Sequence, residues 1–381
     1  MRITTKRIGS IICVAVCLLS MTGCFFNPFK RSSGKSKSSN GISYEEASDK
    51  LLKEYSVQDY SGQVPDGMEI RYVVVKKVYM DDNENRIEYH YDYDNAGRQT
   101  VMIDVNGINE TKYELTYNSD GTIAKKEFTK EKDSRAGNIG PEYYGEYKYN
   151  ENKQLISYTV SEDHLPPTTY NLAYENGHLK SAETDSGTKT YDYSTEGQFY
   201  DYCAVVSDEF YSMSEIEIVK RTYSDNTFER VLTETNNFDR VTYFEYDGDT
   251  LTGWYWIDEW GRTIRWNARG SLVEEIDKDG NLLEKSEYNE HNDRTSYMRY
   301  EDGKLVDKAT SVYEYDSKGN KLSETSNFWY IFEGKESTFI STYKYDYDDR
   351  GLLRAEVHMI DDRFSDMTVY AYKAIIVPSE Y

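Results

Sequence analysis

The sequence predicts an all-β protein: an elongated, twisted antiparallel sheet built as an array of β-hairpin repeats, with one short N-terminal helix. The motif Tyr-x-Tyr-Asp-x-x-Gly recurs along the chain, at residues 91–97, 313–319 and 345–351. Tyrosine, which strands favour, accounts for 38 of the 381 residues. Only six prolines are present, and proline interrupts paired strands.

Residues 1–23 have the pattern of a secretory signal. A basic start precedes an apolar run over residues 8–19, and small residues follow it. The run is shorter than the roughly 20 apolar residues that a membrane span requires. The segment Met21-Thr-Gly-Cys24 resembles the lipobox of bacterial lipoproteins, with Met where Leu is more usual.

This resemblance implies that Cys24 is the lipidated first residue of the mature protein. A diacylglyceryl group supplies two acyl chains, which hold a protein stably at a membrane. The alternative is an ordinary secretory signal cut nearby. We therefore expect an extracytoplasmic, membrane-anchored lipoprotein of a bacterium.

Residues 24–43 are predicted to be a flexible tether, because the segment is rich in Ser and Gly. It carries cations and no acid, which suits an anionic membrane surface. The cations are Lys30, Arg31, Lys35 and Lys37.

Residues 44–60 are predicted to contain a helix that caps the open edge of the first hairpin. Ser43 and Glu46 have the spacing of a capping box. Apolar residues at helical spacing place one face against the sheet; they are Tyr44, Ala47, Leu51, Leu52 and Tyr55.

Residues 61–381 form the predicted repeat domain. Alternation puts the two tyrosines of each motif on one strand face, with rings inward and hydroxyls in water. Asp or Asn then opens a turn, and Gly adopts the positive φ at its exit. Lys153 occupies one such Gly position, and residues 367–378 read as a closing strand.

The repeats resemble two known families. Residues 91–97, 313–322 and 345–353 resemble the YD repeat of RHS-type bacterial surface proteins, and residues 174–181 resemble the MORN-2-type repeat. Together such units cover most of residues 85–355. The resemblance implies an elongated sheet of hairpins. Large RHS proteins enclose a toxin, but the shortness of this chain argues against that role.

Charge and motifs exclude several classes of function. The net charge of −23 disfavours nucleic acid, whose phosphates need clustered cations. Cys203 alone remains after the signal and Cys24, so no internal disulfide is expected. The five histidines lack metal-ligand spacing, and no cofactor motif is present. Residues 81–92 alternate oxygen ligands, but Arg86 replaces the glycine of a calcium loop.

The segment 254–266 holds four of the five tryptophans and is the candidate ligand-binding site. Exposed Trp beside acids and Arg can grip sugars or aromatic peptides by stacking and hydrogen bonding. The alternative is that these rings fill a buried face of the sheet. The candidate residues are Trp254, Tyr255, Trp256, Asp258, Trp260, Arg262 and Trp266.

These observations predict a non-catalytic module for binding or adhesion at the cell envelope, to glycan or protein. One alternative is an extracytoplasmic polysaccharide hydrolase with two carboxylates near the tryptophans. Another is an antitoxin-like or immunity protein that binds a basic partner, with binding that is sensitive to salt.

The Cys24→Ser variant should leave the membrane fraction, because it lacks the thiol that carries the lipid. Fractionation of cells that express the full-length chain tests this. A variant that remains in the membrane fraction would contradict the anchor.

Overall fold

The computed structural model describes most of the chain beyond the tether. The signal, Cys24 and residues 25–40 lie outside the described residues. The described ranges are 41–107, 109–131, 143–162, 165–184, 186–191, 199–206, 217–225, 227, 230–236, 240–332 and 334–379.

The all-β prediction is confirmed, with 25 strands in the described part of the chain. The first half comprises β1 Ser56–Gln58, β2 Met68–Asp81, β3 Arg86–Tyr93, β4 Gln99–Asn106, β5 Asn109–Tyr117, β6 Ile123–Glu131, β7 Tyr143–Tyr149, β8 Leu155–Glu162, β9 Thr168–Glu175, β10 His178–Thr184, β11 Gly187–Thr190 and β12 Phe199–Val205. The second half comprises β13 Glu217–Tyr223, β14 Val231–Thr235, β15 Val241–Asp247, β16 Thr250–Ile257, β17 Thr263–Asn267, β18 Leu272–Ile276, β19 Leu282–Tyr288, β20 Arg294–Glu301, β21 Lys304–Tyr315, β22 Lys321–Phe332, β23 Lys335–Tyr347, β24 Leu353–Ile360 and β25 Arg363–Pro378.

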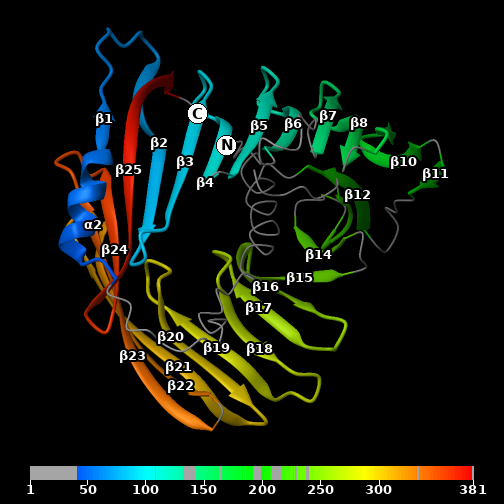
Figure 1. Ribbon diagram of the computed structural model, residues 1–381. Coiled ribbons are helices and arrows are strands. Elements are labelled where there is room, and N and C mark those ends of the chain that lie inside the picture. Colours follow the sequence, from blue (N-terminus) through cyan, green and yellow to red (C-terminus); the bar gives the residue numbers. More distant parts are fainter. Residues whose placement is uncertain are drawn as a thin grey trace.

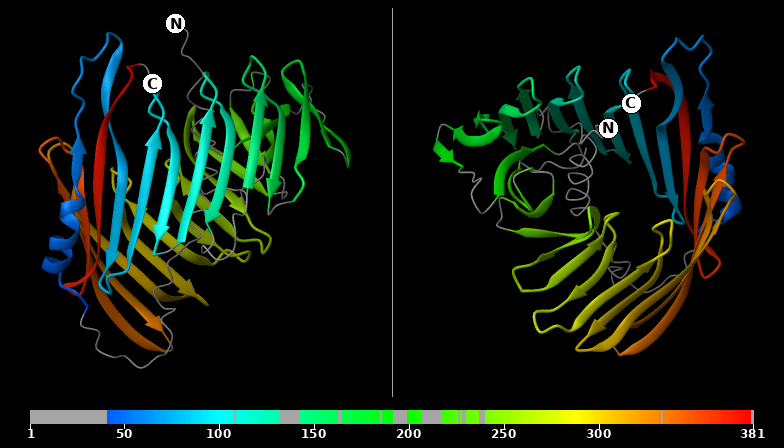
Figure 2. Two further views of the ribbon diagram at one scale, coloured as in Figure 1. Left: turned by 45° about the horizontal axis from the view of Figure 1, so that its top comes forward. Right: turned by 180° about the vertical axis from the view of Figure 1, so that it is seen from behind.

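The strands form one strongly curved, open sheet (Figure 1). From β2 to β11 and from β12 to β25 each strand pairs with the next strand in sequence, and β25 inserts between β24 and β2. The last strand thereby joins the two halves of the array, and β11 and β12 are its two ends. Figure 2 shows the sheet turning back on itself, so that it has an inner and an outer side.

One short helix, α2 (Tyr44–Leu51), begins at the predicted capping box. Glu46 N–H donates to Ser43 Oγ at 3.3 Å, and Ser43 N–H donates to Glu46 Oε2 at 2.9 Å. The helix is shorter than predicted: a 3₁₀ turn, η3 (Leu52–Glu54), follows it, and then β1 pairs parallel to β25.

The sequence predicted that the helix would cap the open edge of a hairpin, and this prediction is wrong. The helix lies on the outer side of the sheet against β2, β24 and β25 (Figure 1). Its buried side chains pack there because the outer faces of these strands are apolar, whereas an edge offers only backbone groups. The cluster comprises Ala47, Leu51, Val78, Met80, Ala355, Val357, Met367 and Val369.

The predicted Asp–Gly corner is a recurring three-residue hairpin turn. At Asp316 the backbone N–H donates to the Asn320 carbonyl at 2.9 Å, and Gly319 N–H returns to the Asp316 carbonyl at 3.1 Å. Asp316 Oδ1 accepts from the N–H groups of Lys318 and Asn320. Gly319 has φ of +84°, and Lys153 adopts +59° at the position where the sequence lacked Gly.

A β-bulge follows many of these turns, in the returning strand. One residue there has no partner opposite, as between Lys321 and Ser323 in β22. At eight bulges, seven in hairpins and one where β2 pairs with β25, the carbonyl just before the extra residue accepts a tyrosine hydroxyl from a neighbouring strand. These bonds are Tyr93 to Val74, Tyr117 to Gln99, Tyr174 to Leu155, Tyr246 to Val231, Tyr288 to Leu272, Tyr313 to Arg294, Tyr347 to Lys321 and Tyr372 to Leu353.

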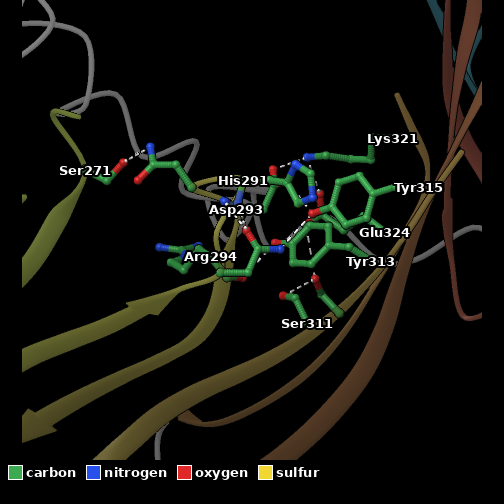
Figure 3. Close-up of polar contacts among 12 residues, drawn as sticks. Ser271, His291, Asp293, Arg294, Ser311, Tyr313, Tyr315, Lys321 and Glu324 are labelled. Atoms are coloured by element: carbon green, nitrogen blue, oxygen red, sulfur yellow. Dashed lines mark hydrogen bonds and ion pairs between the residues drawn. The ribbon is translucent and has the colours of Figure 1, made fainter. Parts of the chain in front are cut away.

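The expectation that the tyrosine hydroxyls lie in water is therefore wrong for these residues. Figure 3 shows one such link, in which Tyr313 donates to the Arg294 carbonyl at 2.6 Å. The next tyrosine, Tyr315, donates to Asp293 Oδ2 at 2.6 Å, and its ring stacks on His291 at 4.1 Å. Each hairpin is thus tied to the one before it by side chains as well as by the backbone ladder.

Replacing Tyr347 by Phe should lower the free energy of unfolding by about 1 kcal/mol, because the Lys321 carbonyl loses its side-chain donor. The matched control is Tyr255→Phe, because the hydroxyl of Tyr255 makes no hydrogen bond within the described residues. That change should stay within about 0.5 kcal/mol. Denaturant unfolding of both variants tests this, and equal stability of Tyr347→Phe and the unmodified protein would contradict the proposed link.

Candidate functional site

The register of the strands determines which side chains face the inner side of the curve. Residues directly opposite in neighbouring strands point to the same side. The α2 cluster marks the outer side, so Asp366, His358 and Tyr343, which alternate with it, face inward. The same pairing, followed strand by strand from β23 to β16, shows that Glu284, Glu275 and Trp256 also face the inner side.

The predicted tryptophan site is split between two environments. Trp254 and Trp266 are 1% and 4% exposed and belong to a buried cluster on the inner side with Val231 and Phe244. Trp256 is partly buried, with its ring 4.4 Å from that of Trp266. The buried-face alternative therefore describes Trp254 and Trp266, whose rings are not free to stack on a ligand.

Trp260 is the tryptophan of this segment that lies in solvent, at 64% exposure. It sits in the turn between β16 and β17, with the Arg262 guanidinium 4.9 Å from its ring centre. Tyr255 lies on the outer side, stacked on Tyr243. The segment thus presents Trp260 and Tyr255 at different places and not as one surface.

Asp258 and Arg262 have a structural task in the same turn. Asp258 Oδ1 accepts from the N–H groups of Trp260 and Arg262, and Arg262 Nε donates to Asp258 Oδ2 at 2.7 Å. These bonds lower the pKa of Asp258 against the opposing effect of burial. The Arg262 Nη1 atom also reaches Glu275 Oε1 at 2.6 Å, so Arg262 connects the turn to the inner face.

Glu275 and Glu284 form a cross-strand pair of carboxylates on that face. Arg262 neutralises Glu275, whereas Tyr297 donates to Glu284 Oε1 at 3.1 Å. Burial, with a further contribution from the charge of Glu275, raises the pKa of Glu284. Two neighbouring carboxyls held in different environments are the arrangement that divides acid and base roles. Glu275 lies opposite Ile264 of β17, and Ile264 lies opposite Trp256 of β16, so Trp256 and both carboxylates form one row across four strands.

A groove of about 430 Å³ lies on the inner side, where the two ends of the open sheet approach one another. Tyr158 of β8 and Tyr170 of β9 stack in parallel, with ring centres 4.4 Å apart and an interplanar angle of 4°. Lys189 lies over the ring of Tyr191 at 5.4 Å. The remaining lining residues are Ala182, Thr184, Ser186, Gly187, Thr188 and Ile218.

Sequence reasoning missed this groove, although a signal for it was present. Tyr158 and Tyr170 are exact cross-strand partners in a hairpin whose strands alternate regularly. The sequence gives no sign that Ile218 lies beside these tyrosines, because Ile218 belongs to β13, near the opposite end of the sheet. The groove depends on the closure of the curve, and not on a local motif.

The oxygen-rich residues 81–92 comprise the end of β2, a hairpin turn at residues 82–85 and most of β3. Asp81 Oδ1 accepts from the N–H groups of Asn83 and Asn85 at 2.9 Å, and Asn85 Nδ2 donates to Asp81 Oδ2. These oxygens are used by the turn itself. Within the described residues, no helix has the length and apolarity that would let it cross a membrane.

Comparison with known proteins gives distant structural similarities. No family model and no curated sequence matches the chain. The solved structure of TcdB2-TccC3-TEV, an RHS/YD-type toxin, is similar at a TM-score of 0.26 and 11% identity, over 78% of this chain and 19% of that one. The chain thus spans about a fifth of that protein.

Two porin-like proteins are also similar. That of Bacteroides uniformis has a TM-score of 0.23 and 12% identity, over 78% of this chain and 96% of that one. That of Bacteroides vulgatus has a TM-score of 0.15 and 10% identity, over 72% and 97%. At these TM-scores none of the similarities carries an argument about function.

The Glu284→Gln variant should gain stability relative to the unmodified protein as the pH rises from about 4 to about 7. A carboxyl whose pKa is raised in the folded state contributes stability at low pH that is lost as the pH rises through that pKa. Glutamine keeps an acceptor for Tyr297 and cannot ionise. Denaturant unfolding at both pH values measures the difference.

The matched control is Glu287→Gln on the same strand, because the Glu287 side chain is 54% exposed and pairs with Lys285 in solvent. It should show no such trend with pH. A Glu284→Gln variant that loses relative stability as the pH rises would contradict the buried, raised-pKa carboxyl.

Proposed function

We propose that this chain is a lipid-anchored protein of the bacterial cell envelope whose hairpin array, of YD and MORN-2-like repeats, binds a glycan without transforming it. The anchor is the thioether at Cys24, and the tether separates it from the sheet. The observation that carries the binding proposal is the groove between the ends of the sheet.

The chemistry of the groove fits a sugar better than an apolar ligand. The faces of sugar rings pack on aromatic rings, and the stacked pair Tyr158–Tyr170 supplies an ordered aromatic surface. Thr184, Ser186 and Thr188 also line the groove, and hydroxyls can pair with the many polar groups of a glycan. A few polar groups set beside aromatic walls are typical of ligand sites.

A second candidate function is hydrolysis of a polysaccharide, favoured by the Glu275–Glu284 pair. Glu284, which accepts from Tyr297, would act as the acid, and Glu275, which pairs with Arg262, as its partner; two carboxyls divide the roles in this way in glycoside hydrolysis. Release of reducing ends that disappears in Glu284→Gln would support this function. A third candidate, capture of a basic protein, rests on the net charge of −23.

The Tyr170→Ala variant should lose about tenfold or more in affinity for purified cell-wall polysaccharide, because it removes half of the stacked pair. The measurement is co-sedimentation of the full-length, detergent-solubilised chain with insoluble wall polysaccharide. The matched control is Tyr243→Ala, which breaks the comparable stack with Tyr255 on the outer side, at 4.9 Å and 11°. It should retain binding.

Three results would overturn the proposal or replace it. Absence of binding by the unmodified chain, or equal losses in both variants, would contradict a site in the groove. Release of reducing ends would replace binding by hydrolysis. Binding only to basic proteins, lost at high salt, would favour the third candidate.

A further inference from the structure

Three strands at the junction of the two halves bring together a serine, a histidine and an aspartate. Ser341 of β23 has its Oγ 2.8 Å from His358 Nε2 of β24, and His358 Nδ1 is 2.9 Å from Asp366 Oδ2 of β25. Their side chains share the inner side of the sheet, because His358 is the cross-strand partner of both Tyr343 and Asp366. No local motif joins them.

The hydrogen bonds fix the direction of proton transfer. An ionised carboxylate can only accept, so His358 Nδ1 carries the hydrogen that reaches Asp366. In the neutral ring Nε2 is then an acceptor, and the Ser341 hydroxyl donates to it. Ser365 Oγ also donates to Asp366 Oδ2, at 2.9 Å, and this holds the carboxylate in place.

Packing holds the imidazole as well. The ring of Tyr343 lies parallel to that of His358, with centres 4.2 Å apart and an interplanar angle of 2°. The histidine side chain is 14% exposed and that of Asp366 is 23% exposed. A nucleophile, a base within hydrogen-bond reach and a third group that orients the base are the parts of an activated hydroxyl.

We propose that Ser341 is an activated nucleophile that takes the acyl group of reactive esters, with His358 as the general base and Asp366 as a positioning residue. The serine Oγ forms a bond to the carbonyl carbon, and its proton passes to His358 Nε2. The ester C–O bond breaks, and the leaving alcohol takes that proton. Water then releases the acyl group as a carboxylic acid by the reverse sequence of proton transfers.

The surrounding sheet limits the class of substrate. Ser341 lies opposite Ser326 on one side and Ile360 on the other, so its strand is paired on both sides. Backbone donors in a ladder are not free to stabilise an oxyanion, which is usually the largest contribution to acyl transfer. The expected substrates are therefore esters with good leaving groups, such as phenyl esters, and a fluorophosphonate should label the site by expelling fluoride.

The test is labelling of the full-length chain with a fluorophosphonate probe, followed by peptide mass spectrometry. Ser341 should react on the order of 100-fold faster than Ser326, because general-base assistance contributes about 10²–10⁴. Ser326 is the internal control: it lies on the next strand and is similarly buried. Its hydroxyl bonds to that of Ser311 and donates to Glu324 Oε1 at 3.3 Å, so it has a weakly basic carboxylate beside it in place of an imidazole. Acidification should slow the reaction of Ser341, since an imidazolium cannot accept its proton.

Variants separate a chemical role from a structural one. Ser341→Ala should abolish the fast labelling and leave only the slow reaction of other serines. His358→Gln should lower the rate of labelling at Ser341 about 100-fold, whereas Ser326→Ala should leave that rate unchanged. Asp366→Asn should lower the rate and alter its dependence on pH. If a variant fails to fold, the comparison of Ser341 with Ser326 and the pH profile of the unmodified chain still decide the outcome. Equal reactivity of the two serines, or a rate independent of pH, would overturn the proposal.

Discussion

The interaction on which the sheet depends is the hydrogen bond, made at eight of its bulges, from a tyrosine hydroxyl to the carbonyl just before the extra residue. A bulge interrupts the ladder and bends the strand, and it leaves a backbone acceptor whose partner must be found elsewhere. Here a tyrosine hydroxyl of a neighbouring strand donates to it, as Tyr347 does to Lys321 and Tyr372 to Leu353. The bulges that bend the sheet are therefore also the points where neighbouring strands are linked by side chains. A hairpin with such a bulge has all its backbone acceptors paired only when its neighbour is present.

The second requirement is that the first and last strands of the repeat array pair with each other, which joins its two halves. β25 pairs over its length with β2, and the outer face of this junction is covered by α2. The inner face of the same region is polar, and it holds Ser341, His358 and Asp366. The carboxylate pair and the tyrosine groove face the same side. All three candidate functional groups therefore lie on the inner side of the curved sheet.

Features that depend on neighbouring residues could be predicted from the sequence. The capping box at Ser43, the turn at Asp316 and the left-handed conformation of Lys153 all follow from local hydrogen bonding. Alternation showed that Trp254 and Trp256 share a face, but it could not show that this face is covered. The β2–β25 pairing joins residues about 300 positions apart, and Ile218 reaches the groove across the open ends; neither has a local signal.

The central claim is that tyrosines build this sheet with their hydroxyls engaged inside it. Burial raises the pKa of Tyr79, Tyr313, Tyr343 and Tyr372 to about 12. The direct measurement is a spectrophotometric titration of phenolate formation with the fold monitored in parallel. These four tyrosines should ionise near pH 12, together with unfolding, and not near the usual value of about 10. Complete ionisation of the tyrosines near pH 10 in a chain that stays folded would contradict the account.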